Sequence, residues 1–311
     1  MPNIKELSKL PERLSGGHRL CAGCGASIVV RQVLMGTKDY VVTGSATGCL
    51  EVATTIYPYT AWRVPFIHNA FENAAATMSG VETAYRALKK KGKINKEIKF
   101  VAFGGDGGTY DIGLQSLSGA LERGHKFVYV CYNNEAYMNT SIQRSGATPR
   151  GADTTTTPVG KVSFGKSQYR KDLLSIVAAH RIPYAAQASV SNWNDLVTKA
   201  EKAFKADGPA FLNIISMCHR GWRFPQEKTI DVAKLSVETG YWPLIEVENG
   251  VWHFTYKPKQ RKPLIEFLKS QGRFKHLFTE KNKHIIDELQ KEVDENWARL
   301  EHLCEASCKV A

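Results

Sequence analysis

Two groups of residues in this 311-residue chain have types and spacing that could do chemistry, and the first surrounds Asp106. The stretch "FGGDGG" (103–108) places Asp106 among glycines, directly after an apolar run. "NNEAYMN" (133–139) follows after one more predicted helix and strand. Because loops that leave neighbouring parallel strands meet at one edge of a sheet, a carboxylate, an amide oxygen and a backbone carbonyl can converge there. Such ligands suit Mg2+, and the glycines let a diphosphate approach the backbone.

The second group consists of cysteines. "HRLCAGCGAS" holds Cys21 and Cys24 in C-x-x-C spacing, and Cys49 and Cys218 each follow a predicted strand. Four thiolates placed in this way can enclose one soft metal site, either zinc or a 4Fe–4S cluster. The odd total of seven cysteines argues against a disulfide framework. The others are predicted to be a buried small hydrophobe (Cys131) and structural or incidental residues, with a ligand role left open (Cys304 and Cys308).

Alternating strands and helices must position both groups. Apolar, β-branched runs predict buried strands at 39–44, 98–105, 125–134 and 209–216. Stretches with helical periodicity predict helices at 73–91, 111–124, 171–180 and 194–206. This alternation predicts an α/β fold with a mostly parallel sheet and helices on both faces.

The pattern changes past about Thr239. Residues 242–258 predict a hairpin with its turn at "ENG", and 281–302 predict a long charged helix. We therefore predict an α/β domain over 1–238 and a C-terminal extension over 239–311. The extension is expected to pack on a partner or on the core, outside the sheet.

Composition excludes little by itself. Lys and Arg outnumber Asp and Glu by 42 to 30, a formal net charge of +12 that attracts nucleic acid, an acidic partner protein or an anionic substrate. No run approaches the ~18 apolar residues of a membrane helix, and the polar N-terminal stretch does not read as a secretory signal. These observations predict a cytoplasmic protein with no membrane partner.

Several long stretches resemble the β subunit of the 2-oxoacid:ferredoxin oxidoreductases, the pyruvate synthase family. They include "GHRLCAGCG", "TGCLEVATTIYPYTAW", "FGGDGGTYDIGLQSLSGALERGH" and "QRSGATP". The resemblance covers nearly the whole chain and implies a thiamine diphosphate-binding fold that holds thiamine diphosphate, Mg2+ and one 4Fe–4S cluster. It assigns Mg2+ to Asp106, Asn134 and the carbonyl of Ala136. It assigns the cluster to Cys21, Cys24, Cys49 and Cys218, and the cofactor surroundings to Gly48, Gly105, Gly107, Gly108 and Asn139.

The resemblance also implies partners. In this family an α-type subunit supplies the glutamate that activates the cofactor, so the chain alone is expected to be inactive. A further iron–sulfur subunit or domain and ferredoxin complete the electron path, and the positive charge of this chain fits an acidic ferredoxin. Glu51 and Glu72 are the local acids on this chain, and we expect both to be structural carboxylates near the site. His68 and Asn69 are candidates for the substrate pocket.

The resemblance implies that the substrate is a small 2-oxoacid, with pyruvate and oxalate as close rivals. Members that use pyruvate commonly have glycine where Ser141 stands in "YMNTSIQ". A hydroxyl there could favour the more polar oxalate, which needs no coenzyme A.

Two other classes of protein remain to be weighed. A basic, zinc-bound nucleic-acid-binding module would explain the charge and the C-x-x-C pair, but its cysteines are spread too widely for a compact zinc ribbon. A cluster-free thiamine diphosphate carboligase would explain Asp106 and Asn134, but leaves four placed cysteines without a role.

Overall fold

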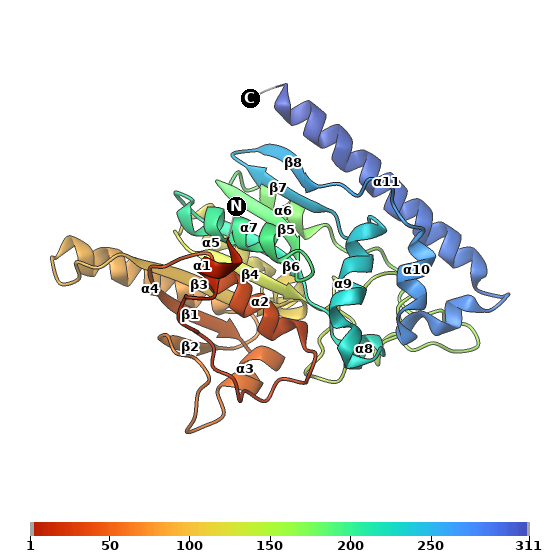
Figure 1. Cartoon of the computed structure of the whole chain (residues 1–311), viewed down its shortest axis with the longest axis horizontal. Coiled ribbons are helices and arrows are strands. Elements are labelled where there is room, and N and C mark those ends of the chain that lie inside the picture. Colours follow the sequence, from red (N-terminus) through yellow and green to blue (C-terminus); the bar gives the residue numbers. More distant parts are fainter. Residues whose placement is uncertain (1–2, 310–311) are drawn as a thin grey trace.

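Eight strands form a single sheet in the order β2-β1-β3-β4-β6-β5-β7-β8 (Figure 1). The computed structural model describes residues 3–309. The strands β1 to β6 pair in parallel, and β7 and β8 add an antiparallel edge. The strands are β1 (Tyr40–Ala46), β2 (Phe66–Asn69), β3 (Ile98–Gly105), β4 (Val128–Asn133), β5 (Tyr184–Ser189), β6 (Ala210–Ile215), β7 (Leu244–Glu248) and β8 (Val251–Tyr256).

Helices separate the parallel strands along the chain. Those before β4 are α1 (Ile4–Leu7), α2 (Gly25–Leu34), α3 (Cys49–Thr54), α4 (Ala74–Lys90), a short π-helical segment η1 (Gly107–Ile112) and α5 (Leu114–Glu122). Those after β4 are α6 (Leu173–Ala178), α7 (Trp193–Lys205), α8 (His219–Trp222), η2 (Gln226–Lys228), α9 (Thr229–Glu238), α10 (Leu264–Lys269), η3 (Gly272–Phe278) and α11 (Lys283–Cys308).

The sheet separates two hydrophobic cores. Successive residues of a strand point to opposite faces, so Val101 and Phe103 of β3 enter one core while Phe100 and Ala102 enter the other. The first core includes side chains from α2, α7 and α9, and the second includes side chains from α4, α5 and α6. The predicted α/β fold, mostly parallel with helices on both faces, is therefore confirmed.

The C-terminal region differs in one respect from the expectation. We expected residues 239–311 to lie outside the sheet, but β7 pairs antiparallel with β5, so the β7–β8 hairpin extends the sheet. The turn falls at Asn249 and Gly250, both with positive φ, as a two-residue hairpin turn requires. The long helix α11 then packs alongside β8 and follows the outside of the molecule (Figure 1). A domain boundary near residue 239 stays a prediction.

Within residues 3–309, no helix combines the length and the apolar character that a membrane crossing requires.

Candidate functional site

The ends of β3 and β4 bring three oxygen-bearing groups together. Asp106 follows β3, Asn134 follows β4, and the two strands are hydrogen-bonded neighbours. The Asp106 carboxylate is completely buried; it accepts a hydrogen bond from the Asn134 backbone N–H at 3.1 Å and another from the Ser145 hydroxyl. One terminal atom of the Asn134 side-chain amide lies 2.8 Å from the carbonyl oxygen of Ala136 and 2.9 Å from Asp106 Oδ1. The three residues expected to hold Mg2+ are thus in mutual contact.

The chemistry of this contact depends on which atom of the Asn134 amide faces the two oxygens. If it is the nitrogen, it donates to both oxygens and the site is satisfied without a metal. If it is the oxygen, three acceptors face one another, and a cation or a proton on Asp106 must offset their repulsion. A carboxylate, an amide oxygen and a backbone carbonyl form a donor set that fits Mg2+, which also keeps positions open for phosphate oxygens.

Burial also perturbs the acid. In the metal-free protein, burial raises the pKa of Asp106 from 3.8 to about 7, although hydrogen bonds from Ser145 and Asn134 oppose the rise. A buried carboxylate that is costly to ionise gains most from a nearby cation.

A small cavity opens beside these oxygens, and we call it the nest cavity. Its volume is about 20 Å3. It is lined by Thr47, Gly48, Cys49, Phe71, Gly105, Gly107, Gly108, Tyr132, Asn134, Ala136, Tyr137, Met138, Asn139 and Thr140. A space of this size holds about one water molecule. A diphosphate cofactor would therefore need a second wall supplied from outside this chain.

The glycines of the nest cavity are constrained by the protein as well as by any ligand. A Cβ on Gly107 would lie 2.3 Å from the Tyr137 ring, and one on Gly108 would lie 2.8 Å from the Phe71 carbonyl oxygen. The helical segment η1 begins directly at Gly107, so its first amides lie at the cavity wall. Close packing of the loop is thus one reason for these glycines, and it adds to the expected approach of a diphosphate.

The four cysteines expected to bind a cluster line one second cavity, which we call the cysteine cavity. Its volume is about 290 Å3, and Cys21, Cys24, Cys49 and Cys218 all face it. Burial raises the pKa of the Cys24 thiol to about 12 and that of Cys49 to about 11, and the neighbouring thiols contribute to both rises. Thiols that resist ionisation so strongly need a bound cation to become ligands.

The spacing of the sulfurs separates the two metals considered for this site. Within the described part of the chain, no three of these four sulfur atoms lie within 4.8 Å of one another. Zinc with tetrahedral bonds of about 2.3 Å would place its sulfurs only about 3.8 Å apart. A 4Fe–4S cluster uses one cysteine on each of four different irons and so spaces them more widely. The sulfurs therefore do not stand at the spacing of a single tetrahedral zinc site.

The two cavities share part of their walls. Cys49, Asn134 and Asn139 line both, and a hydrogen bond from the Asn139 side chain opposes the rise in the pKa of Cys49. The two cavities therefore adjoin at these three residues.

The residues expected in the substrate pocket lie outside the two cavities. His68 is exposed and its Nδ1 lies 2.6 Å from Oε1 of Glu51, while the Asn69 amide is buried and donates to the Ile67 carbonyl. Ser141 is exposed, with φ 86°, and none of these three expected pocket residues lines either cavity. Cys131 is fully buried, as predicted.

Sequence reasoning missed Tyr132 and Ser145. The Tyr132 hydroxyl is buried, lines the nest cavity and lacks a hydrogen-bond partner among residues 3–309. Ser145 hydrogen-bonds Asp106 from 39 positions along the chain. Neither residue belongs to a spacing motif. For Ser145 the signal was its place in "QRSGATP", one of the stretches that carry the resemblance, and Tyr132 had no such signal.

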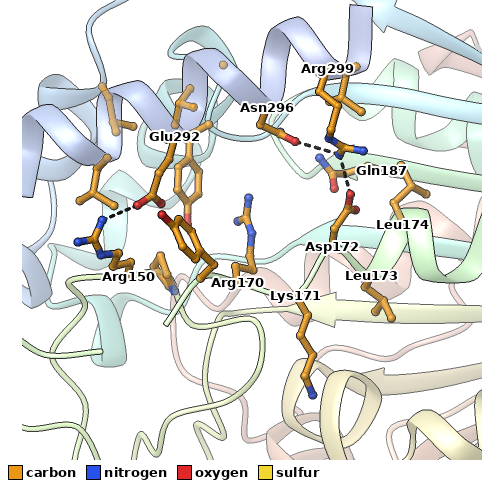
Figure 2. Close-up of a pocket in the computed structure, with 18 of the residues that line it drawn as sticks. Arg150, Arg170, Lys171, Asp172, Leu173, Leu174, Gln187, Glu292, Asn296 and Arg299 are labelled. Atoms are coloured by element: carbon orange, nitrogen blue, oxygen red, sulfur yellow. Dashed lines mark hydrogen bonds and ion pairs between the residues drawn. The ribbon is translucent and has the colours of Figure 1, made fainter. Parts of the chain in front are cut away.

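Two other polar groups lie outside these cavities. A cavity of about 230 Å3 lies between α11 and the core, but its arginines already have partners: Arg150 pairs with Glu292, and Arg299 with Asp172 (Figure 2).

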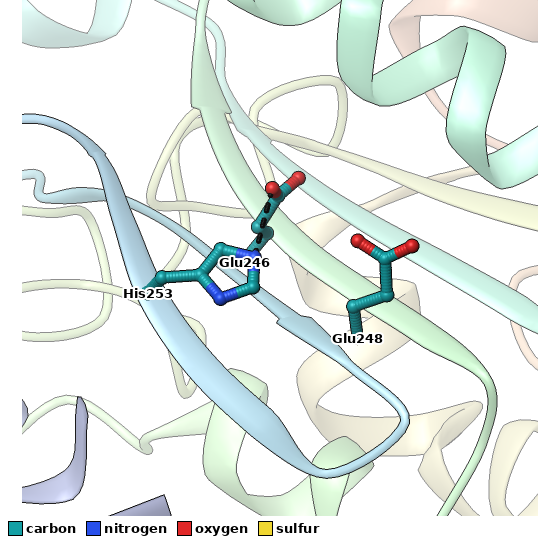
Figure 3. A group of neighbouring side chains, drawn as sticks. All are labelled: Glu246, Glu248 and His253. Carbon is teal, nitrogen blue, oxygen red and sulfur yellow. Dashed lines mark hydrogen bonds and ion pairs between the residues drawn. The ribbon is translucent and has the colours of Figure 1, made fainter. Parts of the chain in front are cut away.

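Glu246, Glu248 and His253 cluster on the β7–β8 hairpin in a way that could suit a metal ion (Figure 3). Lys202 already supplies a cation there, because its Nζ lies 2.8 Å from Glu246 and 3.0 Å from Glu248.

The fold and the site define a class, the thiamine diphosphate-binding α/β proteins, and residues 44–214 match the family model "Thiamine pyrophosphate enzyme, C-terminal TPP binding domain". The chain is 59% identical to pyruvate synthase subunit PorB of Thermotoga maritima, over 96% of this chain and 95% of that protein. It is 54% identical to the subunit of the same name from Methanocaldococcus jannaschii, over 91% and 95%. It is 45% identical to ketoisovalerate oxidoreductase subunit VorB of Pyrococcus furiosus, over 97% of both chains.

Among solved structures, a 2-oxoglutarate:ferredoxin oxidoreductase from Magnetococcus marinus has the same fold, with a TM-score of 0.57 at 20% identity over 88% of this chain and 93% of that one. The chain belongs to the β subunits of the 2-oxoacid:ferredoxin oxidoreductase family, thiamine diphosphate-dependent enzymes that work with partner subunits.

Proposed function

We propose that this chain holds Mg2+–thiamine diphosphate at the nest cavity and one 4Fe–4S cluster in the cysteine cavity, and that it oxidatively decarboxylates a small 2-oxoacid. The observation that carries the proposal is the wall of Cys49, Asn134 and Asn139 that the two cavities share. It supports transfer of electrons from one site to the other over a short distance.

Each residue has a defined part in this proposal. Asp106, Asn134 and the Ala136 carbonyl would hold the cation, and the first amides of η1 would face the diphosphate. Cys21, Cys24, Cys49 and Cys218 would hold the cluster. Bound thiamine diphosphate supplies an electron sink for carbon–carbon cleavage, and the cluster accepts electrons singly.

The small volume of the nest cavity supports the need for a partner. A wall supplied by an α-type subunit, together with its activating glutamate, would complete the cofactor site. The electrons would then pass through a further iron–sulfur subunit or domain to ferredoxin, which the net charge of +12 would attract. A cytoplasmic location remains part of the proposal.

For the substrate we propose pyruvate, because the relatives with 59% and 54% identity are named pyruvate synthase subunits. Oxalate is the second candidate, and it rests on Ser141. Ser141 is exposed on this chain, so it would act on the substrate only if a partner subunit completes the pocket over it.

The test is an anaerobic purification of the chain with its partner subunits, followed by viologen reduction with pyruvate or oxalate, each with and without coenzyme A. Reduction with pyruvate that requires coenzyme A supports the proposal. Reduction with oxalate that is indifferent to coenzyme A replaces pyruvate by the second candidate. A colourless protein that contains zinc and reduces no acceptor would refute both.

A matched pair of variants tests the cluster. Cys218→Ser should lower the iron content of the complex, whereas Cys131→Ser, in the buried core beside the site, should leave the iron content unchanged. Equal iron in both variants and in the parent protein would contradict the assignment.

A further inference from the structure

Glu135 stands between two of the residues expected to hold the metal, and it points away from them. It is completely buried and has φ 63°, in the left-handed region. Its carboxylate accepts hydrogen bonds from the Tyr241 hydroxyl at 2.5 Å, from Arg273 Nη2 at 2.5 Å and from Arg170 Nη1 at 3.1 Å. A buried carboxylate with two guanidinium partners and a phenol is fully compensated.

The backbone around Glu135 is fixed as tightly as its side chain. Its N–H donates to Asn133 Oδ1 at 3.0 Å, and its carbonyl accepts from the Thr148 hydroxyl at 2.6 Å. The preceding carbonyl, of Asn134, accepts from Trp222 Nε1 at 2.8 Å. A residue other than glycine is strained in the left-handed region and persists there only where its surroundings hold it in place. The contacts of Glu135 stabilise this conformation.

Successive groups of this loop point in opposite directions, which explains why the contacts of Glu135 matter. With Glu135 turned into the core, the side chain of Asn134 and the carbonyl of Ala136 converge on Asp106. If residue 135 relaxed to an ordinary conformation, the peptide that follows it would rotate, and the Ala136 oxygen would leave the group. The conformation of residue 135 therefore decides whether three oxygens converge.

The main partner of Glu135 comes from the far end of the chain. Arg273 belongs to η3, beyond residue 239, and Tyr241 lies at the start of the same extension. The Arg273 guanidinium also lies 3.8 Å from the centroid of the Trp222 ring. Trp222 ends α8, the helix that begins directly after Cys218. One guanidinium thus contacts both the loop at the nest cavity and the segment that follows the fourth cysteine.

We propose that Glu135 is a positioning residue for the metal and that, through Arg273 and Tyr241, the C-terminal extension is a working part of the cofactor site. This inference rests on the proposed function, because it concerns the same cation. It assigns to Glu135 no contact with the cofactor or with the substrate.

The test measures the binding of Mg2+ and of Ca2+, each with thiamine diphosphate, to the complete complex after the cofactor has been removed. Calorimetry on Glu135→Gln should give a dissociation constant for Mg2+ about 10–100-fold higher, as for other residues that orient metal ligands. Because Mg2+ demands near-ideal octahedral geometry and Ca2+ tolerates irregular sites, the constant for Ca2+ should rise less. The preference for Mg2+ over Ca2+ should therefore fall.

The matched control is Arg299→Gln. Arg299 also joins the extension to the core, through Asp172, but it does not contact the loop (Figure 2). It should leave both dissociation constants unchanged. If Glu135→Gln does not fold, Tyr241→Phe removes a single hydrogen bond to Glu135 and should raise the Mg2+ constant several-fold with the same loss of preference.

Three outcomes would overturn the inference: unchanged Mg2+ binding in the folded variant, equal weakening of Mg2+ and Ca2+, or an equal effect of Arg299→Gln. The parent complex distinguishes this failure from that of the proposed function. If the parent complex binds Mg2+–thiamine diphosphate and the variants bind it equally well, only the role of Glu135 is refuted. A parent that does not bind it refutes the proposed function.

Discussion

The buried carboxylate of Asp106 predicts an unusual dependence of stability on pH in the metal-free protein. Its pKa in the folded chain is about 7, against an ordinary value of 3.8. At about 1.4 kcal/mol for each pKa unit, this difference corresponds to roughly 4 kcal/mol. The carboxylate is fully buried, so solvent does not screen this cost.

The sign follows from which state holds the proton more tightly. Between pH 4 and pH 7 the folded chain keeps the proton on Asp106 while the unfolded chain releases it, so stability falls as the pH rises. The loss is complete above pH 7. Mg2+ replaces the proton in the proposed site, and it should therefore restore stability most at high pH.

The assay compares the parent protein with Asp106→Asn by denaturant unfolding from pH 5 to pH 8, in a chelator and in excess Mg2+. Without metal, the parent should lose up to a few kcal/mol over this range relative to the variant, which carries no ionisable group at 106. With Mg2+, the parent should recover at pH 8 and the variant should not respond.

A second variant sharpens this test. Ser145→Ala removes a hydrogen bond that lowers the pKa of Asp106, so the fall in stability should move to higher pH. Parallel curves for the parent and Asp106→Asn across the whole range, without metal, would refute the reasoning.

Two further predictions concern Ser141 and Tyr132. Ser141 has φ 86°, so Ser141→Gly should raise the free energy of unfolding by about 1 kcal/mol. The control is Asn249→Gly, which should gain less stability because Asn249 has φ 50° and asparagine tolerates this region. A loss of stability in Ser141→Gly would show that the Ser141 hydroxyl makes a needed contact. Tyr132→Phe removes a buried hydroxyl that lacks a partner among residues 3–309, so unfolding without cofactor should be unchanged or harder, while the dissociation constant for Mg2+–thiamine diphosphate should rise about fivefold, equivalent to about 1 kcal/mol. If Tyr132→Phe binds Mg2+–thiamine diphosphate as tightly as the parent protein, the Tyr132 hydroxyl does not face the ligand.

Local patterns predicted much of the fold. The strand expected at 98–105 is β3, and the helix expected at 73–91 is α4 to within one residue at each end. The strands β2 and β5 were missed for physical reasons. β2 has only four residues, and β5 has the sequence "YAAQAS", whose alanines favour helix. Pairing with their neighbours in the sheet makes both segments strands.

The candidate site divides in the same way. The Asp106 and Asn134 pair could be predicted, because both residues end neighbouring strands. The hydrogen bonds that fix Glu135 could not be predicted, because its partners lie 35, 106 and 138 positions away along the chain and no local pattern indicates them. The place of the C-terminal extension in the sheet could not be predicted either. The sequence of a hairpin indicates its own turn, but not the strand edge with which it pairs.

The contact between Glu135 and Arg273 also has a consequence for the order in which the protein is made. A ribosome that has completed the chain as far as helix α8 has already produced Asp106, Asn134 and all four cysteines of the cysteine cavity, but not Arg273, which contacts Glu135. The site for the cation is therefore completed late, after the segment η2, helix α9, the β7–β8 hairpin and helix α10 have been added. A nascent or truncated chain that ends before residue 273 would carry every ligand and still lack the shape that joins them.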